Sequence, residues 1–484
     1  MAGPGHQGDP HTWAEQQFAT VQVSEVRRAQ RVRKIAAAMA ANPGQSIPQL
    51  WATAYDLKAT YTFLRPEEAT PDNLQAGHRE GVKAALRRPG VYLLVEDTTD
   101  MGWSGKHPIA GLGPVGHGQE GQQGFQLHTV LGVRWPQASV TGVESPRPAV
   151  AVLGVCDQQY HVRGPQQPVE ARGARSLSRK LRERESQVWE RASQRLGPAP
   201  ATPEVRWVRV CDRGADIYEH LQACGELGQG FVVRAAQDRA LVAAATGQKV
   251  GRLFPTARAV AALGAFILEL RSRPQRPARR ARLQVGATPV SLCAPQRPGR
   301  KQGSNPPIAC TAVRVWEVGA PEGVEPLEWV LLCDREVNTW AEALTCVLQY
   351  ATRWVIEEYH KALKSGLGAE RLQLETAAGL MAAIALMRVV ALRLLDLRER
   401  VRVEPEAAAA EAGLTPLEQE VLQLKAGRAL RTVREVALAL GRLGGHLNRR
   451  ADGMPGWQTL WRGMHTLQTL VEGVRLAHRL QQFG

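Results

Sequence analysis

The segment from Pro89 to about Arg239 carries a pattern of apolar runs that few folds can accommodate. The runs are short, rich in Val, Leu and aromatic residues, and bounded by Gly, Pro and charged residues, which is typical of β-strands. We predict strands at residues 91–97, 125–133, 149–156, 205–212 and 230–234, and charged helices at about residues 175–196 and 215–227. The first three strands lie close enough for hairpins and the later ones alternate with helices. This order predicts a mixed sheet with helices on its faces.

The order of elements fits an α/β core of the RNase H-like class, which we assign to residues 89–375. Within it, residues 240–328 hold short β-like runs separated by Pro-rich basic turns, so we predict a mostly β insertion there. A chain of 484 residues is long for a single core. We therefore expect a helical N-terminal domain over residues 1–88, with a disordered lead-in at residues 1–12, and a helical C-terminal domain over residues 376–484.

The chain has a large excess of positive charge. It carries 61 Lys and Arg against 46 Asp and Glu, a net charge of +15, which is typical of proteins that bind a polyanion such as nucleic acid. The alternative is a compositional bias toward Arg. Arg27, Arg28 and Arg31 open an Ala-rich predicted helix, and this basic face favours a phosphate contact over a solvated helix end.

Several classes of protein are not expected. The seven cysteines form no CxxC pair and no zinc-ligand spacing, so we predict free thiols in a reducing cytosol and no structural zinc site. The apolar stretch Ala377–Leu397 contains Arg388 and Arg393, which indicates a buried helix rather than a membrane span. The pattern GxxxxGK followed by Ser or Thr is absent, so we expect no use of ATP.

Two acidic residues end apolar strands. Asp97 follows Val-Tyr-Leu-Leu-Val with only Glu96 between, and Asp212 follows Trp-Val-Arg-Val-Cys. A carboxylate at the carboxyl end of a strand projects into the crevice where open α/β sheets bind ligands. For either Asp alone, a turn or a helix cap is the commoner role. The pair therefore needs a third partner before it indicates a site.

A basic helix predicted over residues 350–364 supplies a third carboxylate. An α-helix rotates by about 100° per residue. On this helix, the hydrogen-bond donors, the cations and one acid fall within a single arc of roughly 100°. These residues are Tyr350, Arg353, Glu357, His360, Lys361 and Lys364. Arg353 and Glu357 are also spaced as an i,i+4 pair, so a salt-bridged surface stripe is the alternative when the helix is taken alone.

The three carboxylates of Asp97, Asp212 and Glu357 predict a metal site. Converging without a cation they would repel, and one would take up a proton. Their hard oxygen ligands suit Mg²⁺, or Mn²⁺, and two ions per site would serve phosphodiester chemistry. One ion would activate a water or a 3′-hydroxyl, and the other would stabilise the leaving 3′ oxygen. Arg353 and Lys364 could offset charge that builds on the phosphate oxygens.

These residues also match a known signature. Tyr350, Arg353, Glu357 and Lys364, with two, three and six residues between them, resemble the YREK signature of the insertion-sequence-four family of DDE transposases, and within it those of the Tn-five type. The similarity runs from Trp13 to about Gly473. Further family-like blocks follow in family order: Glu96–Thr99, Val210–Arg213, Phe231–Arg234, Leu443–Gly445 and Trp457–Gly463.

The resemblance implies a bacterial cut-and-paste DNA transposase, cytoplasmic and bound to the nucleoid when it holds DNA. Asp97, Asp212 and Glu357 would be the catalytic metal triad. The DNA and phosphate contacts would come from Tyr350, Arg353, His360, Lys361, Lys364 and, with less support, Arg234. Trp329 lies 21 residues before Tyr350, where the family has a Trp that stacks on a flipped base during hairpin formation.

The resemblance also implies the partners. The N-terminal helices, with Arg27, Arg28 and Arg31, would bind the inverted repeats at the transposon ends, and the C-terminal helices would form a homodimer. Each active site would act on the end bound by the partner and join it to target DNA. No membrane partner is implied.

Three features depart from the resemblance, and two alternatives stay open. Gly214 stands where a close relative within the family has an acidic residue, the N-terminus is longer than expected, and the basic insertion is poorly matched. A stand-alone nuclease of the same fold is one alternative, although it would need neither long helical end domain. The other is a catalytically silent relic or inhibitor that binds transposon ends or dimerises. Inverted repeats beside the gene would favour an autonomous transposase.

Overall fold

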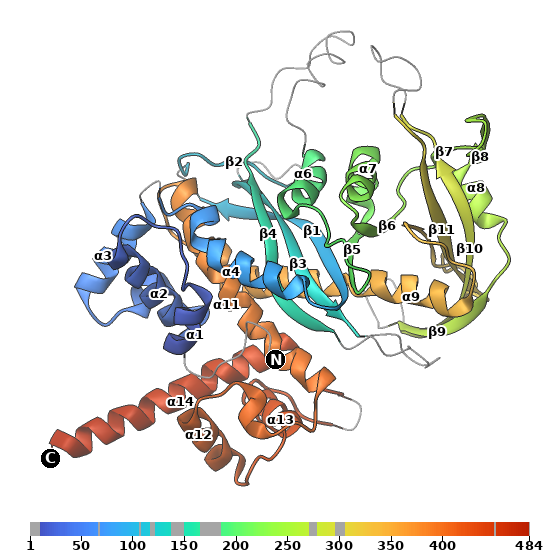
Figure 1. Cartoon of the computed structure of the whole chain (residues 1–484). Helices are drawn as coiled ribbons and strands as arrows, with labels where there is room; N and C mark the ends of the chain where they lie inside the picture. Colours follow the sequence, from blue (N-terminus) through green and yellow to red (C-terminus); the bar gives the residue numbers. More distant parts are fainter. Residues whose placement is uncertain are drawn as a thin grey trace.

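The structure, a computed structural model, describes residues 10–65, 68–105, 108–116, 122–136, 150–164, 185–270, 278–295, 305–449 and 452–483. Its described strands form one sheet in the order β2-β3-β1-β5-β6-β12-β11-β10-β7-β8, with β4 on β3 and β9 on β10 (Figure 1). Helical regions precede and follow the sheet in the chain. The prediction of a mixed α/β protein with helical ends is confirmed.

The first half of the sheet has the predicted order of strands. Its members are β1 (Gly90–Ser104), β2 (Gly113–Pro114), β3 (Gln122–Trp135), β4 (Ala151–His161), β5 (Val205–Cys211) and β6 (Gly230–Arg234). Strand β3 pairs antiparallel with β1 and β4, whereas β5 is parallel to β1 and β6 is parallel to β5. Helices α6 (Gln187–Leu196) and α7 (Tyr218–Glu226) precede β5 and β6. Residues 175–184 of the helix predicted at residues 175–196 lie outside the described residues.

Strands β1, β3 and β4 each extend beyond their predicted bounds, β1 by the most. We expected a strand that ends at Asp97, but β1 continues to Ser104, because β3 pairs with it along its whole length to the pair Ser104–Gln122. The parallel pairing of β1 with β5 nevertheless stops at Val95–Val210. Asp97 therefore lies inside β1, at the level where its parallel neighbour ends.

The predicted β insertion is an extension of the same sheet. It comprises β7 (Ala240–Val242), β8 (Lys249–Arg252), α8 (Leu253–Arg258), β9 (Gly264–Leu270), β10 (Arg279–Leu292) and β11 (Ile308–Val318), and it leads into β12 (Glu328–Cys333). Strand β12 returns to pair with β6, and β11 pairs with β12. The insertion is thus mostly β, as predicted. Much of its basic turns, at residues 271–277 and 296–304, lies outside the described residues.

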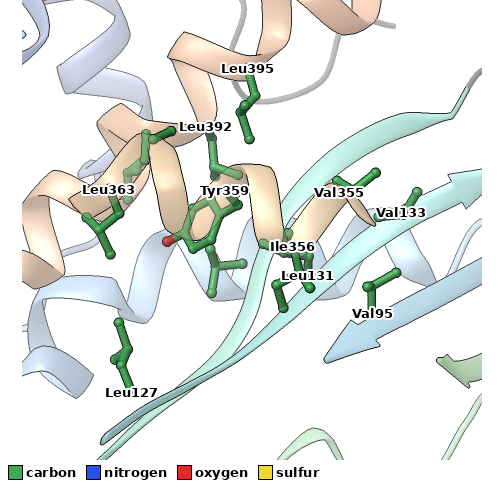
Figure 2. Packing of buried hydrophobic residues seen from close by; sticks show 14 of the residues in the cluster. Val95, Leu127, Leu131, Val133, Val355, Ile356, Tyr359, Leu363, Leu392 and Leu395 are labelled. Atoms are coloured by element: carbon green, nitrogen blue, oxygen red, sulfur yellow. The ribbon is translucent and has the colours of Figure 1, made fainter. Parts of the chain in front are cut away.

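The two faces of the sheet carry different helices. Side chains alternate along a strand, so Leu93 and Val95 of β1 face a cluster with α9 (Trp340–Ala351), α10 (Trp354–Lys361) and α11 (Ala377–Val403). Tyr92 and Leu94 face the other side, where α4 (Pro71–Leu86) and α6 pack. Figure 2 shows Ile356 of α10 next to Leu131 of β3.

The helix predicted over residues 350–364 is interrupted. Helix α9 ends at Ala351, the chain turns through Thr352 and Arg353, and α10 begins at Trp354. After Lys361 the chain winds more widely in a π-helical turn, Ala362–Gly366. The arc calculated for one regular helix therefore does not describe this segment, and each side chain has to be placed individually.

The N-terminal region is helical, as predicted. Its helices are α1 (Pro10–Gln17), α2 (Val26–Ala41), α3 (Ala54–Leu64) and α4 (Pro71–Leu86), with a 3-10 turn at Ile47–Leu50. Residues 10–12 are already in α1 rather than in the disordered lead-in that we expected, and residues 1–9 lie outside the described residues. The Ala-rich face of α2 is buried in the main core.

The C-terminal region has a small core of its own. Helices α12 (Pro416–Ala426), α13 (Val433–Leu443) and α14 (Trp457–Phe483) pack around residues such as Leu422, Leu440 and Leu467. The end of α14 projects from the body of the protein (Figure 1). Helix α11 is long and apolar enough to cross a membrane, but 82% of its most apolar window is buried inside the protein. This confirms the prediction of a buried helix.

Candidate active site

The register of the sheet places the two aspartates side by side. Val95 of β1 pairs with Val210 of β5 in parallel. Asp97 and Asp212 each lie two residues further on, so both point to the same face as these valines. Asp212 directly follows β5 and caps a 3-10 turn, accepting a hydrogen bond from the backbone N–H of Gly214 at 2.8 Å.

Glu357 reaches the same face of the sheet from α10, which packs against it. Its neighbours Val355 and Ile356 are buried against β1 and β3 (Figure 2). The side chain of Glu357 is 45% exposed, so α10 presents its carboxylate at the open edge of this packing. The burial of one side of α10 therefore fixes the position of an acidic group on the other.

Arg353 connects two of the three acids. Its guanidinium lies 3.1 Å from Asp97 Oδ2 through Nη1, and Nη2 donates to Glu357 Oε1. Burial opposes the charge of Arg353, but Asp97 and Glu357 outweigh this effect and hold the pKa of the guanidinium above its usual value. The turn between α9 and α10 thus places one cation between carboxylates that come from a strand and a helix.

The carboxylates influence one another. The pKa of Asp97 is raised to about 6, mainly by burial, and Asp212 and Glu357 raise it further while Arg353 lowers it. This is the behaviour expected of acids that share a site without a sufficient counter-charge. Asp97 is therefore within electrostatic reach of both other members of the predicted triad, and a bound cation would relieve the repulsion.

Two more predicted residues extend this row along the sheet. The β5–β6 register pairs Cys211 with Val233, so Arg234 comes next to Asp212 on the same face. Strand β12 places Leu331 opposite Arg234, and Trp329 lies two residues before it. The sheet therefore aligns Asp97, Asp212 and Arg234 with Trp329 just beyond. Trp329 is partly buried, and its Nε1 lacks a hydrogen-bond partner among the described residues.

The other residues of this segment that were predicted to contact DNA differ in their contacts and exposure. Lys364 lies in the π-helical turn, where Nζ donates to the backbone carbonyl of Asp100 at 2.7 Å and lies 3.1 Å from Glu370. Lys361 is 55% exposed and lies 3.7 Å from Glu358. Tyr350 is part-exposed in the last turn of α9.

The expectation that His360 faces DNA is wrong for this structure. Its side chain is buried, with 5% of the residue exposed, and Nε2 lies 3.3 Å from Thr129 Oγ1 of β3. Burial lowers the pKa of His360 to about 3, so the ring is neutral. It lies at the edge of the predicted arc, where α10 meets the sheet.

The N-terminal arginines are also partly engaged within the protein. Arg31 lies 2.8 Å from Asp56, and Arg28 lies 3.5 Å from Glu68 and over the ring of Phe63. Arg27 is exposed. The basic start of α2 therefore presents a surface on which two of the three cations already have acidic neighbours.

The loop after Asp212 accounts for the departure at Gly214. A Cβ at Gly214 would lie 3.0 Å from Asp212 Oδ1 and 3.3 Å from the ring of Trp189. The loop is therefore packed closely beside the carboxylate, and a larger side chain would have to displace Trp189 or Asp212.

Comparison with known families identifies both ends of the chain. Residues 10–69 match the family model described as Transposase DNA-binding. Residues 389–484 match the Transposase Tn5 dimerisation domain. The chain belongs with the Tn5-like transposases.

The predicted resemblance is therefore confirmed, and the insertion-sequence-four assignment is consistent with both matches. The first match covers α1 to α3 and the second covers the end of α11 together with α12 to α14. These domains support DNA binding and homodimer formation by this Tn5-like transposase. The aspartates and Glu357 lie in the segment between the two matches.

From the sequence we missed one buried ion pair next to the site. Arg209 of β5 is fully buried and forms an ion pair with Glu96 of β1, which is also fully buried. The signal was present, because an arginine inside the apolar run Trp207-Val-Arg-Val-Cys needs a buried acidic partner. We had assigned no role to either residue.

Proposed function

We propose that this Tn5-like transposase is a DDE enzyme with an RNase H-like core that cuts transposon ends, forms and reopens a hairpin, and joins the ends to target DNA. The observation that supports the proposal best is the convergence of Asp97, Asp212 and Glu357 on one face of the sheet, with Arg353 between two of them. The antiparallel trio β4-β3-β1 beside parallel β5 and β6 supports the proposed core class.

The residues fit a divalent metal. Their donors are carboxylate oxygens, which Mg²⁺ and Mn²⁺ prefer. Burial raises the pKa of Asp97 most, and Asp212 and Glu357 raise it further, so a bound cation would favour the ionised form. Asp97, Asp212 and Glu357 would hold the ions. Bound there, two ions would activate the attacking hydroxyl and stabilise the leaving 3′ oxygen.

The surrounding residues would position DNA. We assign phosphate contacts to Arg353, Lys364 and Tyr350, which come from the turn before α10, the π-helical turn after it and the last turn of α9. Arg353 would then exchange part of its contact with Asp97 or Glu357 for a phosphate oxygen. We assign stacking on a flipped base to Trp329, at the end of the row of functional side chains.

Each proposed reaction is a phosphoryl transfer. Water first adds to a phosphate at the transposon end, and the 3′ oxygen leaves. The freed 3′-hydroxyl attacks a phosphate of the opposite strand and closes a hairpin, while the 3′ oxygen of the flanking DNA leaves. Water attacks the same phosphate and releases the 3′-hydroxyl again. This hydroxyl then attacks a target phosphate, and the target 3′ oxygen leaves. The end domains would bind inverted-repeat DNA and hold two chains together, in the bacterial cytoplasm and on the nucleoid.

The triad can be tested with purified protein, a pre-cut duplex of the inverted repeat beside the gene, target plasmid and Mg²⁺. We expect joined products from the wild type. Asp97→Ala, Asp212→Ala and Glu357→Ala should give none while they still shift the end duplex in a gel. Glu325→Ala removes an exposed carboxylate in the turn before β12 and should join DNA like the wild type.

Two results would contradict the proposal. Joining that survives Glu357→Ala would refute the assigned triad. A folded wild type that binds the end duplex but joins nothing with Mg²⁺ or Mn²⁺ would favour a silent relic.

A further inference from the structure

A second cluster of metal-binding residue types lies on the opposite face of the strands that carry the aspartates. Glu96 and Cys211 immediately precede Asp97 and Asp212, so the alternation of side chains sends them to the other side of the sheet. There Cys211 Sγ lies 3.3 Å from Glu96 Oε1. Both residues are fully buried.

Helix α7 completes the cluster. His220 and Cys224 are four residues apart and therefore share one face of the helix. His220 Nε2 lies 3.8 Å from Cys211 Sγ and 3.9 Å from Cys224 Sγ. The ligand atoms of Glu96, Cys211 and His220 all lie within 4.8 Å of one another. One strand pair and one helix thus bring three donors together, and Cys224 adjoins them through its contact with His220.

The cluster is closed to solvent. His220 and Cys224 are fully buried, and Trp189 of α6 packs edge-on against His220 with ring centroids 6.1 Å apart. Burial lowers the pKa of His220 to about 4, so its imidazole is neutral, the form that coordinates metal ions.

We propose that Glu96, Cys211, His220 and Cys224 bind one zinc ion. Tetrahedral zinc with bonds of about 2.0–2.3 Å separates its ligand atoms by roughly 3.3–3.8 Å. The contacts of 3.3, 3.8 and 3.9 Å are close to this range, and the thiol of Cys224 would have to turn toward Cys211 and Glu96 to complete the tetrahedron. Thiolate and imidazole donors select zinc over Mg²⁺. The site is therefore chemically distinct from the carboxylate triad on the other face.

With zinc bound, the formal charges of the four ligands, the ion and Arg209 sum to zero, and His128 lies beside them with Nε2 3.3 Å from Glu96 Oε2. Binding releases the thiol protons of Cys211 and Cys224, so two thiolates and Glu96 supply three negative charges. The zinc ion and the guanidinium of Arg209, paired with Glu96, supply three positive ones. Gln229 accepts from Arg209 at 3.3 Å and holds it beside the carboxylate. Such outer partners orient the ligands of a metal site.

The position gives the ion a structural role. It would tie β1, β5 and α7 together one residue away from Asp97 and Asp212. The sequence did not reveal this site, because Cys211, His220 and Cys224 do not have a familiar zinc spacing and Glu96 is far away in the chain. Only the pairing of β1 with β5 brings it close.

The test uses the full chain, expressed in zinc-supplemented medium and purified without chelators, and it does not depend on joining activity. We expect one zinc per chain by elemental analysis after dialysis. Replacement by Co²⁺ should give a thiolate-to-cobalt charge-transfer band in the near ultraviolet. Removal of zinc with a strong chelator should lower the thermal denaturation midpoint.

Variants separate this site from adventitious zinc. Cys224→Ser should lose the bound zinc and weaken the charge-transfer band, whereas Cys293→Ser, a partly exposed thiol in the insertion, should retain both. A folded wild type with well under one zinc per chain and no cobalt–thiolate band would overturn the proposal. So would a Cys224→Ser variant that keeps the wild-type zinc content and band.

Discussion

Asp97 is the residue at which the electrostatic conflict of the site is greatest. It lies on a buried strand, next to Asp212, and shares Arg353 with Glu357. Burial raises the pKa of Asp97 most, Asp212 and Glu357 raise it further, and Arg353 offsets only part of this rise. Stability and function therefore make opposite demands on this carboxylate.

The first residue-scale prediction concerns pH. The pKa of Asp97 rises from 3.8 to about 6 on folding, so between about pH 4 and pH 6 the folded chain binds more protons than the unfolded chain. Stability should fall as pH rises through this window and level off above it. The Asp97→Asn variant does not lose this stability. At pH 7 without metal, its free energy of unfolding should exceed that of the wild type by up to about 3 kcal/mol.

Thermal denaturation of both proteins in EDTA, from pH 4.5 to pH 7.5, measures the effect. The advantage of Asp97→Asn should grow toward pH 6 and then stay constant. Midpoint curves that run parallel across the range would show that Asp97 has an ordinary pKa.

The second residue-scale prediction concerns Arg353. Arg353→Ala removes the only cation recorded in contact with both Asp97 and Glu357 among the described residues. Joining of pre-cut ends should fall by about 100-fold or more, as when one preorganised donor is lost from an active site. Arg353→Lys keeps the charge but cannot contact two oxygens side by side, so its joining activity should lie between those of Arg353→Ala and the wild type. Equal activity of Arg353→Ala and the wild type would exclude a role at the phosphate.

At the scale of elements, α10 is held by the side that it buries. Ile356 is fully buried and packs toward β1 and β3 (Figure 2). Ile356→Ala should cost about 2–5 kcal/mol of stability and should reduce joining, because Glu357 is its neighbour. Leu424→Ala on α12 removes a side chain that is 76% exposed and should change stability by less than about 0.5 kcal/mol. Denaturation measures both, and an unchanged midpoint for Ile356→Ala would contradict the packing described.

The elements also show how far the sequence could predict this structure. Apolar runs and their acidic ends predicted the strands, and the register of β1 and β5 then brought Asp97 beside Asp212. The regular helix assumed over residues 350–364 failed, because the turn at Thr352 and the π-helical turn after Lys361 depend on tertiary packing. For the same reason His360 was placed toward DNA although the sheet buries it.

At the scale of the whole molecule, the end of α14 is an apolar surface outside the core. Leu476 is 49% exposed and Leu480 is 72% exposed, four residues apart on one face. This segment lies within the matched dimerisation domain. Leu476→Asp combined with Leu480→Asp should reduce the dimer in the complex with end DNA and lower joining at least as much, without loss of fold.

Light scattering of the DNA complex measures the mass, and circular dichroism checks the fold. Leu424→Asp introduces one such charge at an exposed position on α12 and should leave the dimer intact. A double variant that still forms a full dimer on DNA would exclude this part of α14 from the interface.

The most direct test of the central claim is anomalous X-ray scattering from Mn²⁺ in crystals of the protein bound to pre-cut end DNA. We predict manganese peaks within bonding distance of the carboxylates of Asp97, Asp212 and Glu357, next to the terminal 3′-hydroxyl. Manganese bound elsewhere, with Arg353 still joining Asp97 to Glu357, would contradict the account.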